Sequence, residues 1–147
     1  MSEPTKAKLG NLCPVLISHE VRRTVQFYVE KLGFWSAQHY DKMETFATIY
    51  RDAIEFVIVQ AKQGVVESNL KRYGAGFDAY IDPAEIEGVD QLYTEYGGQG
   101  VKILQPPHLT DYGSYEFVFE DVDSRQIGVG RIKEDKTYFK NTTGKPE

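Results

Sequence analysis

The chain has 147 residues, of which 41% are hydrophobic and 27% charged, and its formal net charge at pH 7 is -5. This composition predicts one soluble globular domain, and an acidic chain without a basic cluster argues against binding to nucleic-acid phosphates. The one cysteine, Cys13, excludes an internal disulfide and favours a reducing, cytoplasmic location, while no apolar run is long enough to span a membrane.

The first half of the chain predicts a strand, a helix and three further strands. Residues 12–17 form a short apolar run, and a helix is expected over 21–32 because apolar residues recur there at spacings of three and four. Gly33 is expected to end the helix, since glycine readily takes the left-handed backbone conformation. Strand-like segments then follow, separated by polar turns, at 34–40, 45–50 and 53–59.

The second half repeats this order with a strand at 77–82, a helix at 85–98 and strands at 101–105, 114–120 and 126–130. An offset of 65 residues matches Gly33 with Gly98 in the helices. An inserted loop over 106–113 raises the offset to 73 in the last strands, where Ile54 matches Ile127. The repetition predicts an α+β fold of two β-α-β-β-β modules.

These elements divide the chain into five segments. We expect an N-terminal arm over 1–11 and a single domain over 12–132, followed by a polar tail over 133–147. Within the domain the two modules occupy 12–60 and 75–132, and a polar linker over 61–74 joins them.

Several stretches resemble the vicinal-oxygen-chelate superfamily, which includes glyoxalase I, extradiol dioxygenases and bleomycin resistance proteins. They are CPVLISHEVRRTVQFYVEKLGF at the start and EFVFEDVDSRQIGV at the end, and the resemblance covers 12–132. The closing stretch departs from the family's Asp-Pro-Asp-Gly-Asn turn at Val122, Ser124 and Arg125. Closer similarity is to the bleomycin-resistance branch, through FATIYRDAIEFVI, GVDQLYTEY and DYGSYEF. The resemblance implies curved mixed sheets around a cavity.

Enzymes of this superfamily hold a divalent metal at four sheet positions, usually occupied by histidine, glutamine and glutamate. Matched residue by residue, these positions are Cys13, Glu55, Asp78 and Gly128. Glycine offers no ligand atom, and no imidazole is in the set, so we expect neither a metal cofactor nor catalytic residues. Cys13 is then interpreted as a small buried apolar residue.

Two of these residues are acidic and have a second interpretation. Glu55 alternates with Val57 and Val59, so it is expected on the same face of a strand as they are. Glu55 and Asp78 either contact a cationic ligand or pair with a nearby arginine. Glu55 is also conceivable as a general base, although the sequence supplies no electrophilic partner.

Aromatic residues are the other candidates for ligand binding. Strand alternation places Phe46 and Thr48 on one face, and it places Asp78 and Tyr80 on one face. The resemblance puts the equivalents of Phe46, Tyr80 and Tyr112 in a drug groove, where flat rings stack on a planar ligand. The alternative is that these rings belong to a core or an interface.

The resemblance therefore implies a metal-independent protein that confers antibiotic resistance by binding a bulky, cationic, aromatic drug of the bleomycin type. It also implies a homodimer with ligand grooves at the subunit interface, without nucleic-acid or membrane partners. Two alternatives remain open. One is a metal-dependent lyase, isomerase or dioxygenase of the same superfamily, and the other is a protein-interaction domain.

Overall fold

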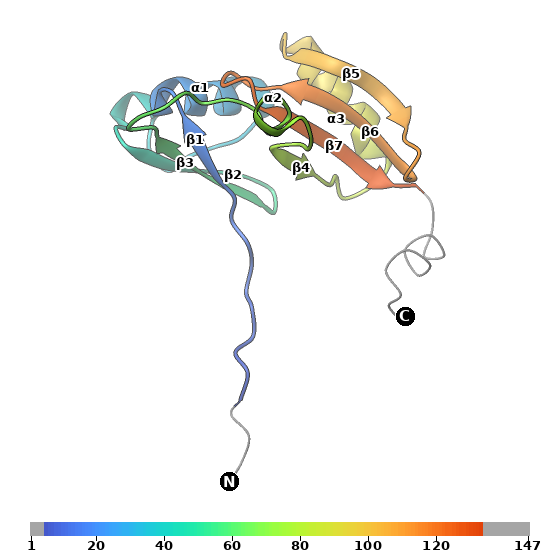
Figure 1. Ribbon diagram of the computed structural model, residues 1–147, viewed down its shortest axis with the longest axis horizontal. Coiled ribbons are helices and arrows are strands. Elements are labelled where there is room, and N and C mark those ends of the chain that lie inside the picture. The colour runs from blue at the N-terminus through green and yellow to red at the C-terminus, as the bar shows by residue number, and fades with distance from the viewer. Residues whose placement is uncertain (1–4, 134–147) are drawn as a thin grey trace.

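The computed structural model describes residues 5–133, which fold into two sheets with a helix against each (Figure 1). The first sheet has three strands in the order β1-β3-β2, and the second has four in the order β4-β7-β6-β5. In each sheet the strand before the helix pairs in parallel with the last strand of its module. The predicted α+β fold of two repeated modules is confirmed.

The first module contains β1 (Val15–Ser18), α1 (Val21–Leu32), β2 (Phe46–Arg51) and β3 (Ile54–Gln60). Apolar residues on one side of α1 are buried against the sheet, and Gly33 ends the helix in the left-handed conformation with φ 76°. Residues 34–40 do not form the expected strand. Trp35 alone pairs with Tyr50, and a short 3-10 helix, η1 (Tyr40–Lys42), follows.

Local hydrogen bonds explain why this strand is missing. The Ser36 hydroxyl donates to the Gln38 carbonyl, and the His39 side chain accepts from the Asp41 backbone N–H. Side chains that bond to the nearby backbone compete with the ladder hydrogen bonds of a sheet. The first sheet therefore ends in one bridge where the second sheet has a full fourth strand.

The second module contains β4 (Ala79–Ile81), α3 (Glu87–Gly98), β5 (Lys102–Leu109), β6 (Ser114–Glu120) and β7 (Gln126–Ile132). A short helix, α2 (Asn69–Tyr73), lies within the segment that joins the modules. The first half of the expected loop over 106–113 is strand, because β5 runs through Pro106 and Pro107 to Leu109, with two shifts of register. An edge strand tolerates proline, since its outward backbone groups need no partner.

No helix in the described part of the chain is long and apolar enough to cross a membrane. The segment before β1 has no regular structure from residue 5, and Figure 1 shows it running away from the sheets. The polar tail expected over 133–147 falls, except for Lys133, outside the described residues.

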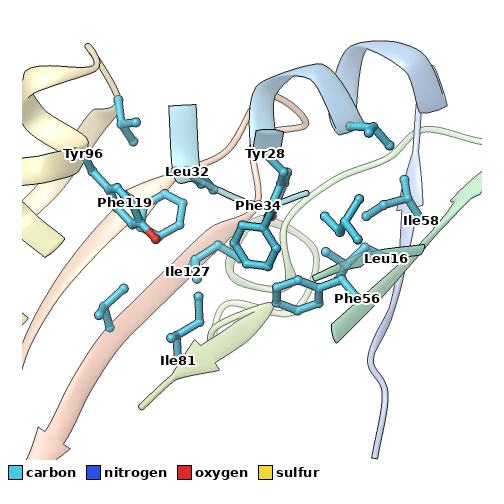
Figure 2. Packing of buried hydrophobic residues seen from close by; sticks show 14 of the residues in the cluster. Leu16, Tyr28, Leu32, Phe34, Phe56, Ile58, Ile81, Tyr96, Phe119 and Ile127 are labelled. Carbon is cyan, nitrogen blue, oxygen red and sulfur yellow. The ribbon is translucent and has the colours of Figure 1, made fainter. Parts of the chain in front are cut away.

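Both modules contribute to one hydrophobic core. Figure 2 shows Tyr28, Phe34 and Phe56 of the first module beside Ile81 and Ile127 of the second. The ring of Tyr28 contacts those of Phe34 and Phe56 edge-on, with centroids 5.5 and 5.9 Å apart. Such contacts favour one fixed packing of the rings within the first module, and Ile81 and Ile127 of the second module belong to the same cluster of buried residues.

A buried polar network reinforces this junction at the turn between β6 and β7. The Arg125 guanidinium lies between two carboxylates, 2.8 Å from that of Asp121 and 2.9 Å from that of Asp123. It also donates to the Ile17 carbonyl in β1, and the Tyr28 hydroxyl donates to Asp121 at 2.7 Å. The turn of the second module is thereby bonded to the strand and helix of the first.

Replacement of Arg125 by methionine is expected to lower the free energy of unfolding by about 3–5 kcal/mol. The change leaves two buried carboxylates without their counter-charge, which costs far more than loss of an exposed pair. The control is Lys71→Met, which removes an exposed pair with Glu67 and should cost less than about 1 kcal/mol. Chemical denaturation of both variants measures the difference, and equal losses would contradict a role for the network in joining the modules.

Candidate functional site

The ends of the two long helices show how the modules correspond. The left-handed glycine after α1 is Gly33, and the one after α3 is Gly100, with φ 78°. Each is followed by a backbone N–H that bonds back into its helix, from Phe34 to Tyr28 and from Val101 to Tyr96. At the helix ends the offset is therefore 67 between the glycines and 68 between the accepting tyrosine carbonyls, and neither equals the 65 inferred from the sequence.

Strand pairing gives the same correction for the candidate metal positions. In the first sheet Val15 pairs with Val57, which places Cys13 beside Glu55, and the Cys13 thiol donates to the Glu55 carbonyl at 3.6 Å. In the second sheet Gly128 pairs with Tyr80. With Glu55 matched to Gly128, as inferred from the sequence, Tyr80 rather than Asp78 lies beside Gly128 as Cys13 lies beside Glu55.

Asp78 has a different environment from the one expected. Its carboxylate accepts hydrogen bonds from the backbone N–H groups of Asn69, at 2.9 Å, and Gln126, at 2.8 Å. These bonds connect the start of α2 to the start of β7. The contact with an arginine that the sequence left open is not among the ion pairs of the described residues.

The Tyr80 ring lies flat over two glycines of β7. A Cβ atom built on Gly128 would come within 2.7 Å of the ring, and one on Gly130 would collide with the Tyr80 hydroxyl. Real Cβ atoms do not approach other atoms so closely, so both positions require glycine while Tyr80 keeps this orientation. The ring thereby occupies the space that a side chain at position 128 would fill.

At the end of this ring lies Glu116, a residue that sequence reasoning did not single out. The Tyr80 and Tyr112 hydroxyls donate to its Oε1 atom at 2.9 and 2.7 Å. The Ser114 hydroxyl also bonds to that of Tyr80, at 2.5 Å. Glu116 is only 2% exposed, whereas the two tyrosines are 41% and 40% exposed. The structure thus joins two predicted ligand-binding residues through a buried carboxylate.

Glu116 and Tyr112 line an open hollow of about 530 Å³ between the linker and strands β5 to β7. Apolar and aromatic side chains form much of its wall, including Leu70, Phe77 and Leu109. A large hollow lined by apolar groups with a few convergent polar groups is the usual form of a small-molecule site.

The remaining candidates lie on the first sheet. Phe46 is 64% exposed, and together with Thr48 it lines a separate hollow of about 450 Å³ beside β2. Glu55 and Val57 are half-buried on β3, where Glu55 pairs with Tyr50. Within one chain the six predicted residues are therefore divided between the two sheets, and only Tyr80 and Tyr112 are brought together by hydrogen bonds.

Residues 13–127 match the model of the Glyoxalase/Bleomycin resistance protein/Dioxygenase superfamily, so the chain belongs to this superfamily. The search of curated proteins gives no match.

Solved structures with the same fold differ widely in function. A bleomycin-binding protein from Streptomyces verticillus, complexed with copper(II)-bleomycin, is 20% identical over 84% of this chain and 97% of its own, with a TM-score of 0.63. A lactoylglutathione lyase from Agrobacterium tumefaciens is 14% identical over 87% and 97%, also with a TM-score of 0.63. A superfamily protein from Alicyclobacillus acidocaldarius is 14% identical over 85% and 92%, with a TM-score of 0.67. At these identities the likeness establishes the fold alone.

The residues at the superfamily's four metal positions do not fit a divalent ion. Cys13 and Glu55 supply one thiol and one carboxylate, while Tyr80 turns its hydroxyl to Glu116 and Gly128 supplies nothing. Burial and the Glu55 carboxylate raise the pKa of the Cys13 thiol, and metals bind the deprotonated form. Across residues 5–133, no three histidine, cysteine or acidic side chains converge as a metal site would require.

Gly128→Ala is expected to lower the free energy of unfolding by about 1–3 kcal/mol, because the added methyl group overpacks against the Tyr80 ring. In a Tyr80→Ala background the same change should cost less than half as much. Gly97→Ala in α3 is the control, since a Cβ there meets no atom within 4 Å. Urea denaturation provides the measurement, and an equal cost in both backgrounds would show that the ring does not occupy this space.

Alkaline titration should reveal the contact between Tyr112 and Glu116. Burial and the Glu116 carboxylate raise the pKa of Tyr112 to about 12. The unfolded chain therefore loses this proton first, so the contribution to stability is complete below pH 10 and disappears as the pH rises toward 12. The pKa values of Tyr28, Tyr80 and Tyr96 are raised as well, first of all by burial. The late part of the tyrosinate titration should therefore lose one tyrosine in Tyr112→Phe, and Glu116→Gln should move part of it to lower pH. An unchanged titration in Glu116→Gln would contradict the contact.

Proposed function

We propose that the protein is a metal-independent binding protein that sequesters a bulky, cationic, aromatic compound, such as a bleomycin-like antibiotic, in the cytoplasm. The Tyr80 ring over Gly128 is the observation that carries the proposal. At a position where the superfamily's enzymes have a metal ligand, the Tyr80 ring supplies an aromatic surface beside the buried carboxylate of Glu116. Sequestration requires only tight binding, which stacked rings and one charged contact can supply without turnover.

The other wall of the binding site is supplied by a second copy of the chain. Val15, Ile17 and Phe46 leave an apolar surface on the first sheet, with exposed fractions of 57%, 45% and 64%. Contiguous exposed apolar surface of this kind marks an interaction site. In a two-fold homodimer, the first sheet of one subunit faces the Glu116 hollow of the other, which unites the two groups of predicted residues in one groove.

Native mass spectrometry of the protein, after incubation with zinc, nickel, iron or manganese and removal of unbound ions, tests the proposal. We expect a dimer that retains no stoichiometric metal and binds metal-free bleomycin at two molecules per dimer. Phe46→Ala and Tyr80→Ala should weaken this binding about tenfold or more, given the area of ring that each removes.

Tyr40→Ala is the matched control, because this aromatic residue contacts Glu30 of α1 and lies outside both hollows. Retained metal at one ion per site would overturn the proposal and direct the search to enzyme substrates. Unchanged binding in Phe46→Ala and Tyr80→Ala would also overturn it, since the drug would then lie elsewhere.

A further inference from the structure

The two oxygens of the Glu116 carboxylate differ in their surroundings. Both tyrosine hydroxyls donate to Oε1, from Tyr80 on β4 and from Tyr112 on the turn between β5 and β6. A carboxylate oxygen has two lone pairs, so these two bonds use the accepting capacity of Oε1. The second oxygen, Oε2, accepts no hydrogen bond from any residue between 5 and 133.

The free oxygen is accessible to solvent, and Glu116 is one of the residues that line the hollow. Every fully buried polar side-chain atom in the described residues has a hydrogen-bond partner, so an unbonded Oε2 has to be in contact with solvent. Glu116 lines the hollow between the linker and β5, and its side chain is otherwise buried. We infer that this oxygen is the part of Glu116 that the hollow exposes.

The charge around this oxygen is unbalanced. Residues that line the hollow include two acids, Glu116 and Asp111, and no lysine or arginine. The hollow beside β1 is different, because Arg72 and Arg125 line it. Tyrosine hydroxyls hold the Glu116 carboxylate in place but leave its negative charge uncancelled, so the hollow attracts a cation.

From these contacts we propose that Glu116 Oε2 binds a protonated primary or secondary amine carried by an aromatic ligand, and that the site prefers this amine to a guanidinium group. A single available oxygen can accept a charge-assisted hydrogen bond from an ammonium group. The planar fork of a guanidinium makes its strongest contact with both carboxylate oxygens at once, and Oε1 is already occupied. Phe77 and Tyr112, which line the same hollow, supply rings for the aromatic part of the ligand.

The inference rests on the proposed function and names the chemistry that its site recognises. Three indole compounds of similar size serve as probes: tryptamine, the corresponding guanidine, and uncharged 3-ethylindole. Ligand-observed NMR titration against the full-length protein measures the three dissociation constants at neutral pH. We expect tryptamine to bind about tenfold or more tightly than 3-ethylindole, with the guanidine between them, as one charge-assisted hydrogen bond predicts.

Two variants test the role of each oxygen. Glu116→Gln keeps the shape of the side chain but removes the charge, and it should bring tryptamine to the affinity of 3-ethylindole. Tyr112→Phe frees a lone pair on Oε1, so it should raise the affinity of the guanidine relative to tryptamine. If Glu116 and the two tyrosines had only a structural role, Tyr112→Phe would not change the affinity of the guanidine relative to that of tryptamine. Thermal denaturation of each variant confirms that it is folded under the titration conditions.

The inference is overturned if wild-type protein shows no preference for tryptamine over 3-ethylindole, with or without detectable binding. It is also overturned if the guanidine binds wild-type protein as well as tryptamine does, or if Glu116→Gln keeps the amine preference. Any of these results would overturn the inference alone, and the proposed function would be kept if bleomycin still binds to the metal-free dimer. Stoichiometric metal retention would instead remove the proposed function itself.

Discussion

The ion pairs of Arg125 fix the relation between the two modules, and the candidate site depends on that relation. This guanidinium bonds within its own turn to Asp121 and Asp123 and across the module boundary to Ile17. A buried charge of this kind is costly unless every group around it is satisfied, so the network tolerates few alternative arrangements of β1 and β7. Both sheets therefore keep one orientation, and their outer faces remain available for ligand and partner.

The repeated fold carries different chemistry on its two sheets. Apolar side chains dominate the outer face of the first sheet, including Val15, Ile17 and Phe46. The second sheet presents tyrosine hydroxyls and the Glu116 carboxylate on the corresponding face. The two-fold dimer that we propose opposes unlike modules and would combine these surfaces, so that one groove would have an apolar wall and an anionic wall. An amphipathic aromatic cation matches both.

The element order, the repeat and the helix α1 could be predicted from the sequence, because periodicity and glycine placement report directly on local structure. The register between the modules could not be predicted from the sequence. Two amphipathic helices can still be matched after a shift of two residues, whereas strand pairing allows one register only. Glu116 was missed for a related reason. Alternation along β6 places Glu116 on the face opposite Phe117 and Phe119, which predicts exposure to solvent, whereas residues 116–119 are all buried in the structure. A carboxylate inside so apolar a strand was the available signal, since burial of a charge requires partners.

The same residues that disfavour a metal are the basis of the preference for an organic cation that we propose. Gly128 and Gly130 allow the Tyr80 ring to lie across β7, and that ring carries its hydroxyl to Glu116 on the neighbouring strand. The Glu116 carboxylate therefore lies on β6, the strand next to β7, where Gly128 occupies the superfamily's metal position. A lone carboxylate with one free oxygen offers a divalent ion too few donors, yet it satisfies a monovalent ammonium group with a single short hydrogen bond. The exclusion of metal and the selection of an amine that we propose would therefore be two consequences of one packing arrangement.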